Sequence, residues 1–292
     1  MVIYNPKDWV KFVFRVDKAD TLYRTFPVIL VVMIYSLGIA YWEINWMDRS
    51  ANSWIKNIPT LHTLVGVAIS ILLVFRTNSA YDRWWEGRKL WGSLVNNSRN
   101  LAIKLDTFIP ENDTEFRDFF REHIPMYASV LRLHLQSDAT LYDLDERKHP
   151  ELILLDTDKH APNQVAKLIF KKIHELFQQG LITGEQFLIL NNEFTALTDI
   201  CGACERIKNT PIPFAYSAFI RKFLFIYILT LPLGYVYTLG YYVAPIVGLV
   251  TYVFGSMEFI AEEIEDPFGL DKNDLPLEKL ANNIKKHIGE II

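Results

Sequence analysis

The sequence predicts an all-α integral membrane protein with four transmembrane helices and a helical cytosolic domain. Half of the 292 residues are hydrophobic, and many of them gather in long stretches that hold no charge at all. The charged residues, 22% of the chain, lie mostly outside these stretches. In the middle of the chain, apolar residues instead return every three to four positions, which is the period of a helix with one buried face.

The first two spans are expected at residues 25–42 and 57–75, which hold 18 and 19 uncharged residues. Crossing the hydrocarbon core of a bilayer takes about 20 apolar residues, within a range of about 17 to 25. Both stretches are therefore long enough, and the alternative is a pair of buried helices in a soluble protein.

A third stretch, residues 223–257, runs for 35 residues without Asp, Glu, Lys or Arg. It is too long for one span and suits a hairpin of two. We expect the turn near residues 238–242, because Gly240 lies there beside tyrosines, which favour the headgroup level of a membrane.

The basic residues predict that both termini and the central segment are cytoplasmic, under the rule that Lys and Arg accumulate on that side. Those before the first span, after the second and before the third are Lys7, Lys11, Arg15, Lys18, Arg24, Arg76, Arg83, Arg88, Lys89, Arg206, Lys208, Arg221 and Lys222. The loop between the first two spans offers only Arg49 and Lys56. The amino terminus shows no secretory pattern, so the first apolar run is expected to stay in the mature protein.

These spans divide the chain into five segments. They are an amphipathic cytosolic N-terminal segment (1–24), a first transmembrane pair (25–75), a helical cytosolic domain (76–220), a second transmembrane pair (221–260) and an acidic cytosolic C-terminal segment (261–292). Helices within the cytosolic domain are expected at residues 90–105, 116–135, 163–178 and 186–208, with a break at 182–185.

An apolar stripe runs along the second span. Val67, Ile71 and Phe75 are spaced by four residues, so they share one face of a helix. One interpretation is a face packed on other helices. The other is a hydrophobic constriction lined by one such stripe from each subunit of a ring, which can gate a pore by dewetting.

Three tryptophans, Trp84, Trp85 and Trp91, follow the second span among basic residues. Tryptophans of this kind often anchor a helix at the membrane interface. That interpretation does not explain why so polar a helix should continue directly from an apolar span.

An acidic stretch, residues 262–274, follows the last apolar segment. Clustered carboxylates on a turning loop can hold Ca²⁺, which takes six to eight oxygen ligands. The spacing is not that of an EF-hand loop, and a solvated acidic face is the alternative.

Catalytic and zinc motifs are weak. Cys201 and Cys204 form a CxxC without a second Cys pair or a CxxH partner, so two buried thiols are the better interpretation. The seven histidines form no HExxH, no GxSxG elbow occurs, and an enzyme is therefore not expected. The net charge of −4 also argues against nucleic-acid binding.

Four motifs, in the same order along the chain, make it resemble the bestrophins, and most closely their bacterial branch. They are IPxxxxxxG from Ile58, RWW from Arg83, PIPFAY from Pro211, and AEEIEDPFG from Ala261 followed by NDLPL. The resemblance implies a homopentamer around one central pore in the bacterial inner membrane.

The resemblance also implies roles for particular residues. The family's narrow neck corresponds to Val67, Ile71 and Phe75, and its cytosolic aperture falls at Glu185, where relatives carry an apolar residue. A ring of Glu185 carboxylates would favour cations. The family's calcium clasp corresponds to Glu263, Asp266, Asp271 and Asp274, but Lys272 and Asn273 replace acidic residues there.

The function implied is an ion channel that conducts small monovalent ions through a hydrophobic neck, namely chloride or other anions by family, with cation permeation plausible for the bacterial branch. No cofactor other than Ca²⁺ is implied. The alternatives are a secondary transporter and a membrane-anchored scaffold. A transporter would normally carry charged residues at mid-membrane and a repeat of hydropathy, and neither is visible.

Overall fold

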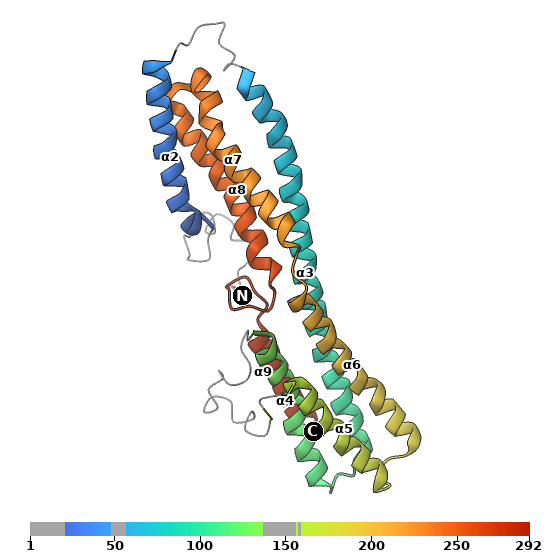
Figure 1. Ribbon diagram of the computed structural model, residues 1–292. Helices are drawn as coiled ribbons and strands as arrows, with labels where there is room; N and C mark the ends of the chain where they lie inside the picture. The colour runs from blue at the N-terminus through green and yellow to red at the C-terminus, as the bar shows by residue number, and fades with distance from the viewer. Residues whose placement is uncertain (1–20, 48–56, 137–155, 157–158) are drawn as a thin grey trace. The chain divides into compact units, whose positions relative to one another are not determined.

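The computed structural model describes residues 21–47, 57–136, 156 and 159–292, and all regular structure in these residues is helical. The predicted N-terminal segment, except for its last residues, lies outside the described residues. Figure 1 shows the helices, which are α2 (Thr21–Trp46), α3 (Ile58–Phe108), α4 (Thr114–Gln136), α5 (Ala161–Gln178), α6 (Gly184–Asn209), α7 (Phe214–Leu239), the 3₁₀ turn η5 (Gly240–Tyr242), α8 (Val243–Glu265) and α9 (Leu277–Ile291).

The chain forms two compact units. The membrane unit comprises the described residues up to Arg83 together with Pro211–Asp266, and the polar unit comprises Trp84–Thr210 and Pro267–Ile292. The units thus divide six to ten residues away from the segment boundaries expected from sequence, and the C-terminal segment is shared between them.

All helical stretches that are long and apolar enough to cross a membrane include residues of the membrane unit. They are Thr21–Trp46, Ile58–Phe108 and Phe214–Glu265. The third contains α7 and α8, which η5 separates at Gly240, whose φ of 54° suits a residue without a side chain. The hairpin and its turn are therefore where the sequence predicts them.

Glycines on α3 and α7 make room for large side chains of the other helix. A Cβ on Gly66 of α3 would lie 2.7 Å from the Tyr227 hydroxyl of α7, and one on Gly234 of α7 would lie 2.6 Å from Cγ2 of Ile58. The His62 ring of α3 adds a polar contact, because its Nε2 lies 3.0 Å from the Thr230 hydroxyl. These contacts attach α3 to α7.

Helix α3 runs for 51 residues without interruption. A polar helix thus continues directly from the second span and includes the helix expected at residues 90–105. The interpretation of the tryptophans as a membrane belt is wrong for Trp91, which is fully buried in the core of the polar unit. Trp84 also bonds within the polar unit, since its indole N–H donates to the Asn273 carbonyl at 3.1 Å.

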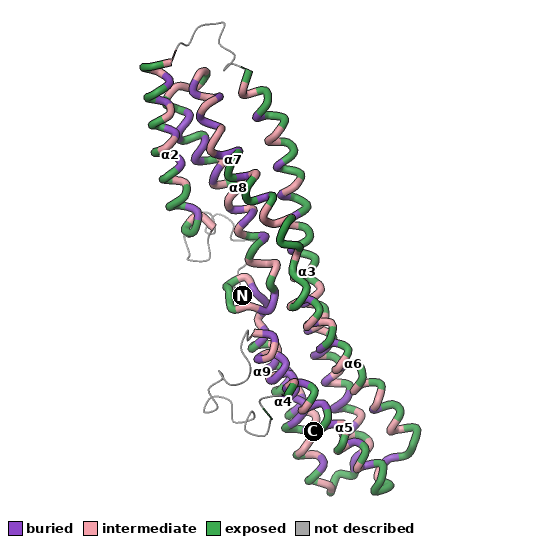
Figure 2. Tube along the Cα trace, in the orientation of Figure 1, coloured by how far each residue is buried: buried purple, intermediate pink, exposed green. Residues whose placement is uncertain are grey.

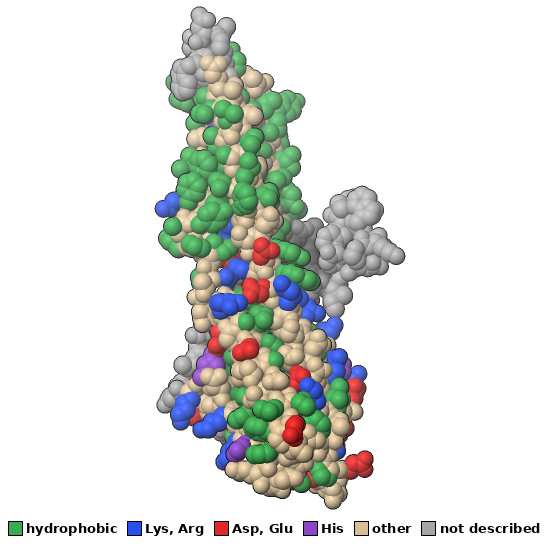
Figure 3. All heavy atoms as spheres, turned by 90° about the vertical axis from the view of Figure 1, so that its right-hand side faces the viewer, with side chains coloured by type: hydrophobic (Ala, Val, Ile, Leu, Met, Phe, Trp, Pro, Cys, Tyr) green, Lys and Arg blue, Asp and Glu red, His purple; other side chains and the backbone are tan. Residues whose placement is uncertain are grey.

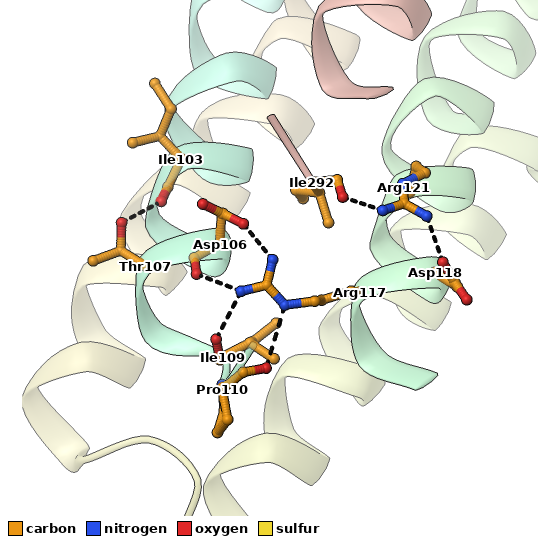
Figure 4. Close-up of polar contacts among 9 residues, drawn as sticks. All are labelled: Ile103, Asp106, Thr107, Ile109, Pro110, Arg117, Asp118, Arg121 and Ile292. Atoms are coloured by element: carbon orange, nitrogen blue, oxygen red, sulfur yellow. Dashed lines mark hydrogen bonds and ion pairs between the residues drawn. The ribbon is translucent and has the colours of Figure 1, made fainter. Parts of the chain in front are cut away.

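The end of α3 is held by an arginine from α4 (Figure 4). The Arg117 guanidinium pairs with the Asp106 carboxylate, and Nη2 donates to the carbonyls of Asp106 and Ile109 at 2.9 and 3.0 Å. The last carbonyls of a helix have no partner within it, so Arg117 supplies the missing donors.

The polar unit has a conventional apolar core between α3, α4, α5, α6 and α9. Helix α6 begins at Gly184, two residues before the predicted start, because Thr183 and Gln186 form a capping box. Helix α9 is absent from the sequence prediction, which expected only an acidic segment. It buries Leu277, Ala281 and Ile284, a helical spacing that was visible in the sequence.

Candidate functional site

The apolar stripe of α3 lies on the outside of the membrane unit. Val67, Ile71 and Phe75 are 57%, 52% and 61% exposed, whereas Ile69 and Leu73 are 2% and 0% exposed. Figure 2 shows exposed and buried residues recurring along this part of α3. The helices that the structure describes therefore leave the stripe uncovered, and it is available to a pore, a neighbouring subunit or lipid.

Lipid-facing surface is abundant elsewhere on the membrane unit. Figure 3 shows hydrophobic side chains over much of the face drawn there, and α2 alone leaves Val31 64% and Ile34 61% exposed. Exposure alone therefore does not distinguish a pore-lining stripe from a lipid-facing one.

Directly after the stripe on α3, Arg76 forms a buried ionic cluster with α8. Its guanidinium is 1% exposed, and Nη1 lies 2.7 Å from a Glu265 oxygen while Nε lies 3.7 Å from a Glu258 oxygen. The second oxygen of Glu258 accepts from Arg221 of α7 at 2.8 Å. Shared carboxylates thus connect α3, α7 and α8 where the uncharged part of α3 ends.

Two further arginines extend this cluster. Arg24 of α2 pairs with Glu263 at 2.5 Å, and Arg83 Nε donates to the Glu265 carbonyl at 3.0 Å. The second Glu265 oxygen accepts the backbone N–H of Ile212 at 3.0 Å, which fixes the segment before α7. Glu263 and Glu265, at the start of the acidic stretch, therefore pair with basic residues, whereas Asp266 and Asp271 are exposed.

Glu185, the predicted aperture residue, lies in the first turn of α6 and is fully exposed. Hydrogen bonds from its own backbone and from the Thr183 side chain lower the pKa of its carboxyl group below the usual value. Glu185 is therefore ionised at neutral pH. The neighbouring Leu188 and Ile189 are exposed as well.

The predicted calcium ligands fall in both units. Glu263 and Asp266 belong to the membrane unit, whereas Asp271 and Asp274 belong to the polar unit. The Asp271 N–H donates to the buried Asp274 carboxylate at 2.6 Å, which folds this loop on itself. Calcium binding at these residues stays a prediction.

The two thiols of the CxxC lie in the core of the polar unit, as expected. Cys201 and Cys204 are free and are 3% and 0% exposed. Burial raises the pKa of each thiol to about 12. Both are therefore protonated and unreactive at neutral pH.

The structure also brings together residues that the sequence analysis did not connect, namely His134, His160 and Glu205. They come from α4, the start of α5 and α6, so no local spacing relates them. Only the fold of the polar unit makes them neighbours.

Comparison with known proteins identifies the family. The model of the bacterial and fungal bestrophin family (Bestrophin_2) matches residues 1–290. Voltage-dependent anion channel-forming protein alr2987 of Nostoc sp. is 35% identical over 243 residues, which cover 80% of this chain and 79% of that protein. The corresponding protein sll1024 of Synechocystis sp. is 32% identical over 299 residues, with 99% and 93% covered.

Solved structures agree with this match. The crystal structure of a mutant bacterial bestrophin homologue from Klebsiella pneumoniae superposes with a TM-score of 0.78 at 26% identity and covers 92% of this chain and 98% of that chain. The chain belongs to the bacterial and fungal bestrophin family. The resemblance deduced from the four motifs is thus confirmed, and the chain is a membrane protein.

Proposed function

We propose that this chain is one subunit of a pentameric ion channel in the bacterial inner membrane, with both termini in the cytoplasm. In this proposal Val67, Ile71 and Phe75 of each subunit line a hydrophobic neck. The observation that carries it is the apolar stripe on α3, which the described residues of the chain leave exposed. Membership of a family whose curated members are named anion channel-forming proteins supports a channel rather than an enzyme.

The physical basis of the neck is dewetting. Water and ions are unstable in a narrow apolar passage, so a ring of such stripes closes a pore unless it widens. The charged cluster around Arg76 begins one residue after Phe75. It anchors α3 to α8, and the stripe on the opposite face then keeps a fixed orientation.

The first test is electrical. Purified protein reconstituted in a planar bilayer should give discrete unitary currents. Slow saturable flux without unitary events would favour a secondary transporter, and no flux at all would favour a scaffold, so either result contradicts the proposal.

The second test addresses the neck. Ile71→Ala and Phe75→Ala should each raise unitary conductance, because they shorten the dewetted passage. Val31→Ala on α2 is the matched control, since Val31 is equally exposed and apolar but lies outside the proposed neck. Equal currents in all three variants and the wild type would show that the stripe faces lipid or protein.

Two observations disagree about whether the permeant ion is an anion or a cation. The names of the relatives favour anions, whereas a ring of ionised Glu185 side chains would favour cations. We propose that Glu185 contributes to selectivity, so Glu185→Gln should shift the reversal potential in asymmetric salt toward anion permeation. An unchanged reversal potential would remove Glu185 from the aperture.

Control of the channel by calcium is the most detailed property that the family resemblance implies. The residues of this chain match the family least well at the proposed calcium ligands. Glu263 is paired with Arg24, and Lys272 and Asn273 stand where the family has acidic residues. If calcium acts through the proposed ligands, open probability in the bilayer should change with free Ca²⁺, and Asp274→Asn should abolish that response.

A further inference from the structure

Three side chains with metal-binding atoms converge inside the polar unit. His134 lies in the last turn of α4, His160 is the N-cap of α5, and Glu205 lies in the second half of α6. One ligand atom from each lies within 4.8 Å of the other two, and no other group of His, Cys, Asp or Glu in the described part of the chain meets this criterion. All three side chains are partly buried.

The two imidazoles point at the same atom. His134 Nε2 lies 2.7 Å and His160 Nε2 lies 2.5 Å from Oε1 of Glu205. The ring centroids are 4.6 Å apart and the rings are tilted by 60°. Two imidazole nitrogens from separate elements thus contact one carboxylate oxygen. Metal ligands can contact one another in this way when no metal lies between them.

The surroundings of the cluster limit which cation it could hold. Lys208 donates to the His134 carbonyl at 3.1 Å and places a positive charge nearby, and Arg206 is occupied by Glu86 at 2.9 Å. The cluster therefore holds a single carboxylate, which is too few for Ca²⁺ or Mg²⁺, because those ions require mostly oxygen ligands.

We propose that His134, His160 and Glu205 form a binding site for a divalent transition metal of the Zn²⁺ class. Two imidazole nitrogens and one carboxylate are a ligand set that Zn²⁺ accepts, with water in the fourth position. Imidazole binds such metals strongly, whereas it is a poor ligand for the hard cations.

Binding needs only small movements. Three ligands of a tetrahedral zinc ion lie about 3.4 Å apart, given metal–ligand distances of about 2.1 Å. The two nitrogens must therefore each withdraw from the Glu205 oxygen by less than about 1 Å. Side chains that are partly exposed can make such a shift without disturbing the helices.

Binding also requires a change of tautomer. At present His160 Nδ1 accepts the Asn163 N–H at 3.2 Å, so Nε2 carries the hydrogen and donates it to Glu205. When the metal takes Nε2, the hydrogen moves to Nδ1 and the Asn163 N–H loses this acceptor. Asn163 is exposed, so its N–H then donates to water instead.

The consequence is a metal that ties three helices together. The ligands come from the end of α4, the start of α5 and the C-terminal half of α6. Such a tie stabilises the folded polar unit, because a metal that binds only the folded state shifts the unfolding equilibrium toward it.

The test is a direct binding measurement on the full-length protein in detergent, after treatment with a chelator. Zn²⁺ is titrated in competition with a chromogenic chelator, and one tight site per chain is expected. His134→Gln and Glu205→Gln should each weaken binding about a hundredfold, since changes even to groups behind the ligands weaken such sites by about ten- to a hundredfold. Excess Ca²⁺ should not compete.

Two variants keep the test independent of folding. His160→Asn removes the imidazole but keeps an N-cap acceptor for α5, so it should fold and still lose tight binding. His174→Gln changes an exposed histidine on α5 outside the cluster and should bind as the wild type does. Absence of a tight site in the wild type, or unchanged affinity in His160→Asn, would overturn the proposal.

Discussion

In the membrane unit, α2, α3, α7 and α8 leave large apolar side chains outside and bury polar ones such as His62, Arg76 and Glu258. The polar unit does the reverse, with Trp91, Leu101 and other apolar side chains in its core and charges outside. Helix α3 takes part in both arrangements. The difference shows that one helix can expose apolar side chains in one part and bury them in another. Lipid is as apolar as these side chains, so burying them inside the membrane unit gains no hydrophobic free energy.

The largest effect expected from this contrast concerns Arg76. Arg76→Met should destabilise the membrane unit by about 3 to 5 kcal/mol, because it leaves buried carboxylates without their cation. Thermal unfolding in detergent, followed by circular dichroism, measures this. Lys89→Met, an exposed change on the same helix, is the control and should have little effect.

A second change at Glu265 sharpens this test. Glu265→Gln in the Arg76→Met background should restore part of the lost stability, since it removes one of the unpaired charges. If Arg76→Met unfolds at the same temperature as Lys89→Met, the buried cluster does not hold α3 to α8.

The counterpart in the polar unit is Arg117, whose guanidinium bonds carbonyls at the end of α3 (Figure 4). Arg117→Met should cost about 1.5 to 3 kcal/mol, because hydrogen bonds from a charged donor are lost. The effect should be smaller than that of Arg76→Met, because the Arg117 side chain is 14% exposed whereas that of Arg76 is 1% exposed. The same unfolding measurement applies, with Lys171→Met as the exposed control, and an equal loss from Arg76 and Arg117 would contradict the contrast.

Substitutions at two glycines of the membrane unit should change its stability by smaller amounts and in different directions. Gly234→Ala should destabilise by about 1 to 3 kcal/mol, because its Cβ would meet Ile58 Cγ2 at 2.6 Å. Gly38→Ala meets nothing within 4 Å and should be neutral or stabilising by up to about 1 kcal/mol. An unchanged or raised unfolding temperature for Gly234→Ala would show that the contact of Gly234 with Ile58 does not need a residue without a side chain.

The smallest effect concerns the buried thiols. Cys201 and Cys204 should resist alkylation in the folded protein at neutral pH, because burial raises both pKa values to about 12 and denies access to the reagent. Mass spectrometry after brief treatment with an alkylating agent should find no adduct before denaturation and two after it. Adducts on the folded protein would show that α6 opens in solution.

Much of the membrane unit was predictable because its pattern is simple. An uncharged run of sufficient length specifies a span whichever face it presents, so α2, α3 and the α7–α8 hairpin are found near their expected places. Helix α9 was not predicted, because the whole C-terminal segment was interpreted from the acidic residues that precede the helix. Its apolar spacing at Leu277, Ala281 and Ile284 was a sufficient pattern.

The candidate sites were less predictable because they depend on contacts between distant residues. The stripe of Val67, Ile71 and Phe75 follows from spacing within one helix. The pairing of Arg76 with Glu265, and of His134 with Glu205, joins residues that no local period relates. The CxxC was correctly interpreted as buried, whereas the histidines that contact Glu205 could not be placed from sequence.

The unbroken length of α3 has a consequence for how this chain can change in evolution. Each residue added to a helix turns everything beyond it by roughly 100°. A single insertion between Trp84 and Trp91 would therefore turn Trp91 and the apolar residues after it relative to Trp84, which is bonded to Asn273 of the same unit. A loop absorbs an extra residue, but this segment cannot. Changes in length should be confined to the connections between helices, and within α3 an insertion of four residues, close to one full turn, should be tolerated better than an insertion of one or two.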